Sequence, residues 1–363
     1  MSFCNAPWVN ISIDPNGDVL PCCRINKQVF KPDNLKNYTL KEAWNGSALQ
    51  NLREKFTELE KPEECLDCYK IEESGLKSYR EIINERNDKV DLNLETEPPI
   101  YYDLKTTNVC NLKCRMCSSF NSSIIAKEQK EDNTWWTTEK LMTKENGATF
   151  SSWLKIGKEL AIAGGEPFVN PETKRIIESA PKHMCFHINT NGMFYQQKLV
   201  DEMLKFERVF ISISVDDLYE RLEYARSNSK WKLIKENVLK FAQLEKDNDN
   251  LDVHIYCTVN NYNIWYLEEF FDYFKSINVK VNYQALTRPK ELNISCLSSK
   301  VKTKIYDKYK NTKHKEIKSL MNYVCTQHPD LSKQFKEFND TKDLIRKEKF
   351  EDVFPEWAKV IYG

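Results

Sequence analysis

The sequence has no excess of charge of either sign. Lysine plus arginine and aspartate plus glutamate both number 54, so the formal net charge is zero. Without a global field, the chain does not select nucleic acid or a membrane surface as its partner. Local imbalance is found at residues 300–318, which have eight lysines and two acidic residues. It is typical of a solvated helix face, or of a docking site for an acidic redox partner or a phosphate-bearing substrate.

Long apolar segments are also missing. Nowhere do about 18 apolar residues stand together, and Met1–Trp8 lacks the basic region and apolar run of an export signal. We therefore expect a soluble, cytoplasmic protein. Disulfides are rare in that compartment, although the chain has 12 cysteines. Metal binding is a better use for those cysteines that cluster.

The length of 363 residues suits two domains, or one large domain with additions. The acid-rich stretch 95–99 ends in two prolines, which resist regular structure. We therefore expect a cysteine-rich first domain over 1–98, an α/β domain over 99–287 and a helical extension over 288–363.

Strand-like runs alternate with helix-like runs after residue 100. The six predicted strands are 100–105, 159–163, 185–190, 209–215, 253–259 and 279–284. This alternation implies parallel strands with right-handed crossovers, hence an α/β barrel or an open sheet. Six strands are too few to close an eight-stranded barrel.

Polar side chains alternate with apolar ones along the later strands. In 209–215, Ser212 and Ser214 share one face, opposite Ile211 and Ile213. The pattern recurs at His254, Tyr256, Thr258, Asn282 and Gln284. A face lined with hydroxyls and amides predicts a ligand cavity. The alternative is the solvent-facing side of an open sheet.

Three cysteines, Cys110, Cys114 and Cys117, lie in the loop after the first predicted strand, where α/β barrels form their active sites. Structural zinc takes four protein ligands, and a disulfide joins two cysteines. Thiolates spaced Cys-x3-Cys-x2-Cys can bind three irons of a cubane and leave the fourth iron to another ligand. The triplet therefore predicts a [4Fe–4S] cluster with an open iron.

The second predicted strand leads into Ala161-Ile-Ala-Gly-Gly-Glu-Pro167. Gly164 and Gly165 have no side chains, so the backbone there can approach a ligand closely. A plain tight turn is the alternative.

Together, these two segments resemble the radical S-adenosylmethionine (SAM) superfamily over about residues 99–287. The resemblance implies a partial (β/α)6 TIM-like barrel. It also implies that SAM binds the open iron and is cleaved by the reduced cluster to a 5′-deoxyadenosyl radical. Met116 matches the position that packs against adenine, and Gly164, Gly165, Glu166 and Pro167 match a segment along the SAM amino group.

Further cofactor contacts follow from the same resemblance. The positions that often meet the ribose of SAM are Thr190, Asn191, Ser212, Ser214 and Asp216. Arg226 resembles an arginine that often contacts the methionine carboxylate, and a surface charge on a helix is the alternative. No residue is assigned a catalytic role beyond these contacts.

Four cysteines near the N-terminus, Cys4, Cys22, Cys65 and Cys68, resemble the auxiliary iron–sulfur module called SPASM, or its shorter form, twitch. The resemblance implies a second cluster, most simply [4Fe–4S]. Zinc is the alternative for four cysteines. In better-known members the module follows the barrel, so its position here leaves open which cysteine completes the set and how the module docks.

A hairpin over 11–19, with Asn16 and Gly17 as its turn, would bring Cys4 and Cys22 together. Cys23 would point to the opposite side of a strand. We therefore assign Cys22, rather than Cys23, to the auxiliary site.

The expected function is hydrogen abstraction from a substrate after SAM cleavage, with one auxiliary cluster. The expected substrate is a peptide or protein side chain that is oxidised or cross-linked. A small molecule, such as a sugar, nucleotide or cofactor precursor, is the alternative, and a non-catalytic electron-transfer protein is a third. A reductase such as flavodoxin or ferredoxin is the expected partner, with no membrane and no clear nucleic-acid binding.

Overall fold

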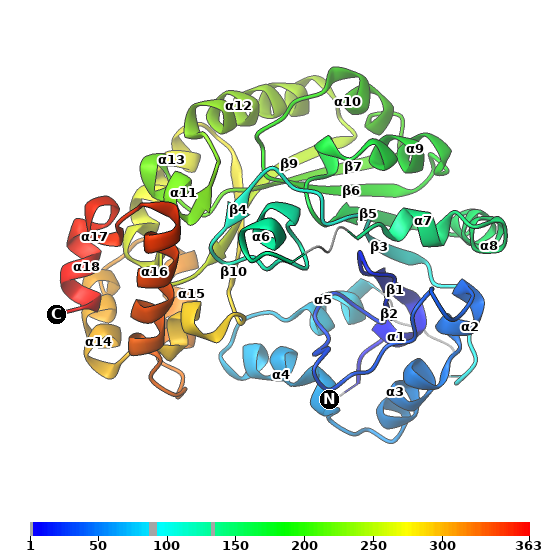
Figure 1. The fold of residues 1–363 in the computed structure, drawn as a ribbon, viewed down its shortest axis with the longest axis horizontal. Helices are drawn as coiled ribbons and strands as arrows, with labels where there is room; N and C mark the ends of the chain where they lie inside the picture. Colours follow the sequence, from blue (N-terminus) through cyan, green and yellow to red (C-terminus); the bar gives the residue numbers. More distant parts are fainter. Residues whose placement is uncertain (1–2, 87–92, 132–134) are drawn as a thin grey trace.

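The structure is a computed structural model that describes residues 3–86, 93–131 and 135–363. Its centre is an eight-stranded sheet with the order β10-β9-β7-β6-β5-β3-β1-β2 (Figure 1). Six strands correspond to the predicted ones: β3 (Tyr101–Lys105), β5 (Glu159–Ala163), β6 (Cys185–Thr190), β7 (Arg208–Ser214), β9 (Leu251–Val259) and β10 (Lys280–Ala285). They pair in parallel with one another. The α/β fold class is therefore confirmed.

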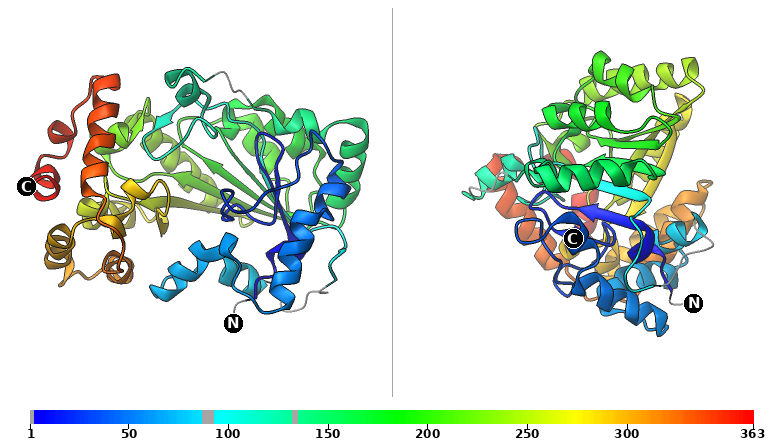
Figure 2. Two further views of the ribbon diagram at one scale, coloured as in Figure 1. Left: turned by 60° about the horizontal axis from the view of Figure 1, so that its bottom comes forward. Right: turned by 90° about the vertical axis from the view of Figure 1, so that its right-hand side faces the viewer.

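One face of this sheet is buried under the crossover helices (Figure 2). Along β9, Leu251, Val253, Ile255, Cys257 and Val259 are all buried, and the residues between them are half-exposed. The helices that follow strands β5 to β9 are α9 (Pro171–Ser179), α10 (Gln197–Met203), α11 (Tyr219–Ala225), α12 (Trp231–Asp247) and α13 (Leu267–Ser276). Apolar residues alternate with polar ones because only this face packs against helices.

The opposite face, here called the inner face, carries the polar side chains. Ser212, Ser214, His254 and Tyr256 are half-exposed on it. The sheet has two free edges, β10 and β2, so the described residues form an open sheet and not a closed barrel. The face is polar and half-exposed, and its use as a ligand cavity stays a prediction.

The N-terminal segment extends the same sheet. β1 (Asn10–Ile13) pairs in parallel with β3, and β2 (Val19–Leu20) pairs antiparallel with β1. Gly17 has φ +93°, a conformation that favours glycine, so the predicted hairpin turn is confirmed. The sequence did not indicate that β1 would continue the sheet. The division at residue 98 stays a prediction, and residues on both sides of it share one apolar core.

Helices account for most of the remaining chain. The N-terminal ones are α1 (Ala6–Val9), α2 (Leu40–Trp44), α3 (Ser47–Thr57), α4 (Leu66–Glu73) and α5 (Tyr79–Arg86). Between β3 and β5 lie the short strand β4 (Lys113–Cys114), α6 (Ser123–Glu128), α7 (Thr137–Leu141) and α8 (Lys144–Leu154). The C-terminal ones are α14 (Ser299–Tyr309), α15 (Lys315–Val324), α16 (Ser332–Arg346), α17 (Phe350–Val353) and α18 (Pro355–Ile361).

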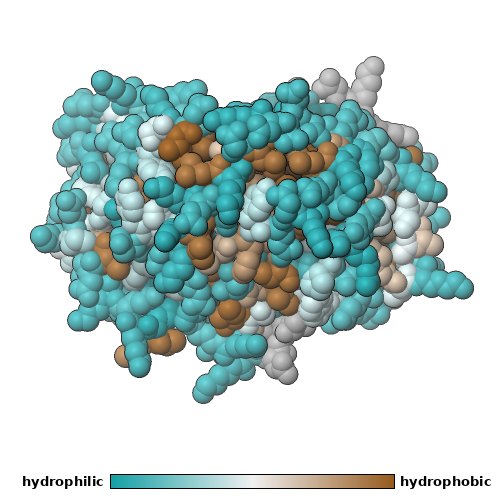
Figure 3. Space-filling view, turned by 90° about the horizontal axis from the view of Figure 1, so that it is seen from above, coloured by the Kyte–Doolittle hydropathy of each residue, from teal (hydrophilic) through white to brown (hydrophobic). Residues whose placement is uncertain are grey.

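The face shown in Figure 3 is mainly hydrophilic. Seen from above the view of Figure 1, hydrophilic side chains cover most of the molecule, with apolar patches between them (Figure 3). Six of the eight lysines in 300–318 are exposed, in keeping with a solvated helix face. Within the described ranges, no helix combines the length and the apolar content that a bilayer span requires.

Candidate functional site

The three-cysteine loop follows β3 and is bound to the segment after α11. β4, which contains Cys114, pairs antiparallel with β8 (Arg226–Ser227). The Arg115 N–H donates to the Ala225 carbonyl at 2.8 Å. Cys114 is buried, while Cys110 and Cys117 are half-buried. The backbone that carries the thiols is therefore held by β8 and by the end of α11.

The three thiols lie close enough to influence one another's titration. Burial raises the pKa of Cys117 to about 12, and the neighbouring Cys114 adds to the effect. Burial likewise raises the pKa of Cys110, with a further contribution from Cys114. Such thiols hold their protons in the metal-free protein, and iron binding would displace them. Their grouping fits a cluster held by three protein ligands.

Gly164 and Gly165 form the turn after β5 and pack on the start of this loop. Their φ angles are +80° and +55°. A Cβ atom on Gly165 would lie 2.2 Å from the Val109 carbonyl oxygen, and one on Gly164 would lie 2.7 Å from Cβ of Lys105. The Glu166 N–H donates to that same Val109 carbonyl at 2.9 Å. The glycines therefore make room for the chain's own backbone just before Cys110, a role that the sequence did not reveal.

Glu166 is fully buried and joins the ends of β5 and β6. Its carboxylate accepts hydrogen bonds from the backbone N–H groups of Phe168 (3.0 Å) and Asn191 (2.7 Å) and from the Thr190 hydroxyl (2.8 Å). The Asn191 side chain also donates to Asn111 in the cysteine loop at 2.8 Å. The structure thus brings three predicted SAM contacts together, and these contacts support the loop.

Glu166 also makes a testable contribution to stability. Burial raises its pKa to about 7, although its hydrogen bonds oppose the shift. Because the folded pKa exceeds the unfolded one, the stabilisation is complete below the unfolded pKa of about 4.3 and is lost as the pH rises through about 7. We expect the metal-free protein to lose roughly 3 kcal/mol of unfolding free energy at most over this range, and Glu166→Gln to lack this component. Urea titrations at several pH values measure it, and equal slopes for the two proteins would contradict it.

Arg226 lies immediately after α11 and is 9% exposed, so its interpretation as a surface charge is wrong. Its Nε donates to Oδ2 of Asp216 at 2.8 Å, and Nη1 lies 4.0 Å from Sγ of Cys114. Oδ1 of Asp216 accepts from the Thr258 N–H at 2.9 Å. The structure places this ion pair beside the cysteine loop. Direct contact of either residue with SAM stays a prediction.

Of the remaining predicted SAM contacts, Ser212 and Ser214 lie on the inner face of β7, while Met116 and Pro167 lie in connecting segments. The Ser212 hydroxyl hydrogen-bonds Nε2 of His254 at 2.7 Å. Ser214 and Met116 are half-buried, and Pro167 begins the short 3-10 helix after Glu166.

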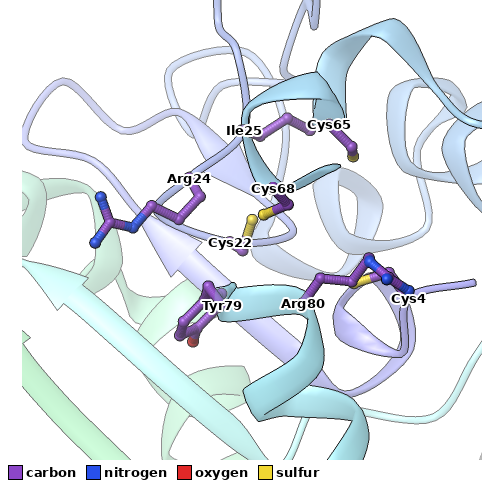
Figure 4. Close-up of a pocket in the computed structure, with 8 residues that line it drawn as sticks. All are labelled: Cys4, Cys22, Arg24, Ile25, Cys65, Cys68, Tyr79 and Arg80. Atoms are coloured by element: carbon purple, nitrogen blue, oxygen red, sulfur yellow. The ribbon is translucent and has the colours of Figure 1, made fainter. Parts of the chain in front are cut away.

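The four N-terminal cysteines line one cavity. Cys4, Cys22, Cys65 and Cys68 come from three separate segments and line one small pocket (Figure 4). Its other lining residues are Arg24, Ile25, Tyr79 and Arg80. Cys23 is an exposed residue, but its thiol is buried and hydrogen-bonds to Asp103 of β3 instead. Cys22 and Cys23 therefore face different surroundings, although both lie beyond the end of β2 and not in a strand as predicted.

This cavity suits a cluster better than a single ion. Zinc draws its ligands to about 2.3 Å from one point, whereas a cubane is bound at four separate irons. Burial raises the pKa of Cys4 to about 12, and Cys68 contributes to the shift. Four thiols around one cavity, that of Cys4 buried and the others half-buried, fit the donor set of a [4Fe–4S] cluster.

Polar contacts attach this module to the far edge of the sheet. The guanidinium of Arg24 points away from the four cysteines (Figure 4) and donates to Gln284 of β10. Arg288, beyond β10, pairs with Asp67 at 2.9 Å and donates to Asn26 at 2.8 Å. The module thus contacts both β3 and β10. No sequence pattern singled out Arg24 or Arg288.

These features define a parallel α/β protein with two cysteine sites of the iron–sulfur type. The model of the radical SAM superfamily matches residues 104–274, and that of the SPASM iron–sulfur cluster-binding domain matches 4–69. Residues 104–274 thus match the radical SAM superfamily, and residues 4–69 match a SPASM domain that precedes them. These families imply [4Fe–4S] clusters and SAM as cofactors.

Relatives of this chain are distant. An uncharacterised protein of Methanocaldococcus jannaschii is 26% identical over 194 residues, which cover 52% of this chain and 63% of that relative. A structure of anSMEcpe with bound AdoMet and a peptide is 17% identical, with a TM-score of 0.41, over 68% of this chain and 60% of that one. Streptococcus suis SuiB bound to SAM is 12% identical, with a TM-score of 0.41, over 98% of this chain and 75% of that one.

Proposed function

We propose that this chain cleaves SAM reductively at the Cys110, Cys114 and Cys117 site and uses the resulting 5′-deoxyadenosyl radical to abstract a hydrogen atom from a substrate. The substrate radical then loses one electron to the auxiliary cluster and one proton, which completes a two-electron oxidation. The carrying observation is that one fold holds two separate groups of thiols, one of three and one of four. An external reductase such as flavodoxin or ferredoxin supplies the electron for cleavage.

The chain's own residues position these components. Glu166 and the glycine turn fix the backbone before Cys110, and Arg226 brings a positive charge to within 4.0 Å of the Cys114 sulfur. The ion pair with Asp216 holds the guanidinium in that position. The inner face carries half-exposed polar side chains that could contact a substrate.

We take a peptide or protein side chain as the substrate class, with oxidation or cross-linking as the reaction. An open sheet supports this proposal, since a side chain can enter the inner face while the rest of a long substrate stays outside. Three polar side chains favour the alternative of a hydroxyl-rich small molecule. Ser212 hydrogen-bonds to His254 of β9, and Tyr256 is on the same face of β9.

Iron analysis tests the two-cluster arrangement. We expect anaerobic reconstitution to give about eight irons per chain, and about four in Cys22→Ala. Cys23→Ala is the matched control and should keep about eight irons, because its thiol faces Asp103 and not the cavity. A wild-type value near four that is insensitive to Cys22→Ala would remove the auxiliary cluster from the proposal.

Deuterium transfer tests the reaction itself. Candidate peptides and small molecules labelled at C–H positions are incubated with the reconstituted protein, SAM and dithionite. Deuterium in 5′-deoxyadenosine identifies the substrate class and the position attacked. If 5′-deoxyadenosine forms without deuterium from any labelled peptide but acquires it from a labelled small molecule, the peptide proposal is wrong and the alternative stands.

A further inference from the structure

The C-terminal extension reaches the cysteine loop through Arg115, which lies between Cys114 and Met116. The Arg115 side chain is 1% exposed. Its Nη2 donates to Oδ1 of Asp343 and to Oε2 of Glu348, both at 2.6 Å. Asp343 is in α16, and Glu348 follows the end of that helix. Two acidic side chains from the extension thus neutralise one buried cation of the loop.

The surroundings of Arg115 fix its orientation further. Its guanidinium lies 3.6 Å from the ring centroid of Tyr224, and its Nε donates to the Tyr224 carbonyl at 3.2 Å. The Tyr224 hydroxyl donates to Oδ1 of Asp343 at 2.8 Å, and the Phe350 N–H donates to Oδ2 at 2.8 Å. Both carboxylate oxygens of Asp343 are therefore engaged.

A second arginine of α16 makes a parallel connection. Arg346 donates to the Glu128 carboxylate of α6 through Nε at 3.0 Å and Nη2 at 2.8 Å. Its Nη1 donates to Ser227 at 3.0 Å. Ser227 belongs to β8, the strand that pairs with Cys114 in β4. We call Arg115, Glu128, Asp343, Arg346 and Glu348 the C-terminal network.

The energetics of this network favour a role in geometry over one in stability. Removing charges from water is costly, and buried ion pairs are often no more stabilising than apolar residues of the same volume. Their directional hydrogen bonds, however, restrict the side chains to one arrangement. Arg115 is adjacent to two residues of the cluster site, so this restriction acts directly on the loop that bears the thiols.

We propose that Arg115, Asp343 and Glu348 are positioning residues that hold loop 110–117 in the conformation that binds the cluster and SAM. The C-terminal extension is then part of the cluster site, although it lies outside the radical SAM match at 104–274. The inference rests on the proposed function, since it concerns the same cluster and SAM.

The test compares Asp343→Asn and Glu348→Gln with Asp340→Asn. Asp340 is on the same helix, and its ion pair with Lys336, at 2.7 Å, is exposed. We expect the first two variants to raise the KM for SAM about tenfold, the scale found when residues that orient metal ligands are replaced. They should also alter the change that SAM causes in the electron paramagnetic resonance spectrum of the reduced cluster. Asp340→Asn should behave as wild type.

Two outcomes would overturn the proposal. One is a wild-type KM and spectrum in both test variants, even if their melting temperatures fall. The other is an equal effect of Asp340→Asn. Should Asp343→Asn fail to fold, Glu348→Gln decides, because the Glu348 side chain is 30% exposed and lies beyond the helix.

A metal-free measurement separates this proposal from the proposed function. Hydrogen–deuterium exchange of residues 110–117 should be faster in Asp343→Asn and Glu348→Gln than in Asp340→Asn and wild type. If wild type shows no spectral response to SAM, the proposed function fails. The exchange rates then still show whether the network orders the loop, and equal rates would refute it.

Discussion

A Gly165→Ala variant is expected to form 5′-deoxyadenosine from SAM about 100-fold more slowly than wild type, the upper end of the loss seen when support of a metal site is removed. The added Cβ would lie 2.2 Å from the Val109 carbonyl oxygen, a distance that no relaxed contact allows. The backbone before Cys110 must therefore move. The hydrogen bond from the Glu166 N–H to the same carbonyl would be lost with it.

Gly75→Ala separates this clash from backbone strain. Gly75 also has a positive φ, +78°, but a Cβ there meets nothing within 4 Å. The Gly75→Ala variant should lose only roughly 1–2 kcal/mol of unfolding free energy, the cost of a left-handed conformation for alanine. Its rate of SAM cleavage should be unchanged. Chromatography of dithionite-driven reactions gives the rates, with iron content and melting temperature measured alongside. Wild-type rates in Gly165→Ala would show that the glycine turn does not support the loop.

The six strands after residue 100 were predictable because each carries its own signal. Alternating apolar residues, as in Val209, Ile211 and Ile213, indicate a strand that is buried on one face. The cysteine triplet was equally predictable, because the cluster that they would bind sets the spacing of Cys110, Cys114 and Cys117. In both cases the physical constraint acts between residues that are close in sequence.

Contacts between distant segments were not predictable in this way. The sequence of β1 predicts one strand of a hairpin. Its four residues do not indicate that β3 is its second neighbour in the sheet. Arg115 has no local partner, because Asp343 and Glu348 lie more than 200 residues further along the chain. Arg226 follows a helix and carries a charge, a combination usually found at the surface, yet Asp216 makes its burial possible.

The two cysteine sites should separate in mutants that each remove one thiol. Cys114→Ala is expected to abolish formation of 5′-deoxyadenosine, because Cys114 is the buried thiol of the three-cysteine loop. The loss should exceed the roughly 100-fold that is the upper limit for replacing residues that only support metal ligands. Cys68→Ala is expected to keep this activity, since its thiol lines the other cavity. It should instead lose the oxidised product, because the electron left on the substrate has no acceptor.

The contrast between these variants matters more than either loss alone. General misfolding would lower both activities together, whereas two independent sites predict that 5′-deoxyadenosine formation survives in Cys68→Ala and not in Cys114→Ala. Dithionite-driven assays of the two variants with the substrate found by deuterium transfer measure both products in the same sample. Product formation at the wild-type rate in Cys68→Ala would mean that the N-terminal cavity takes no electron from the reaction. That cavity would then be structural, and the electron would have to leave by another route.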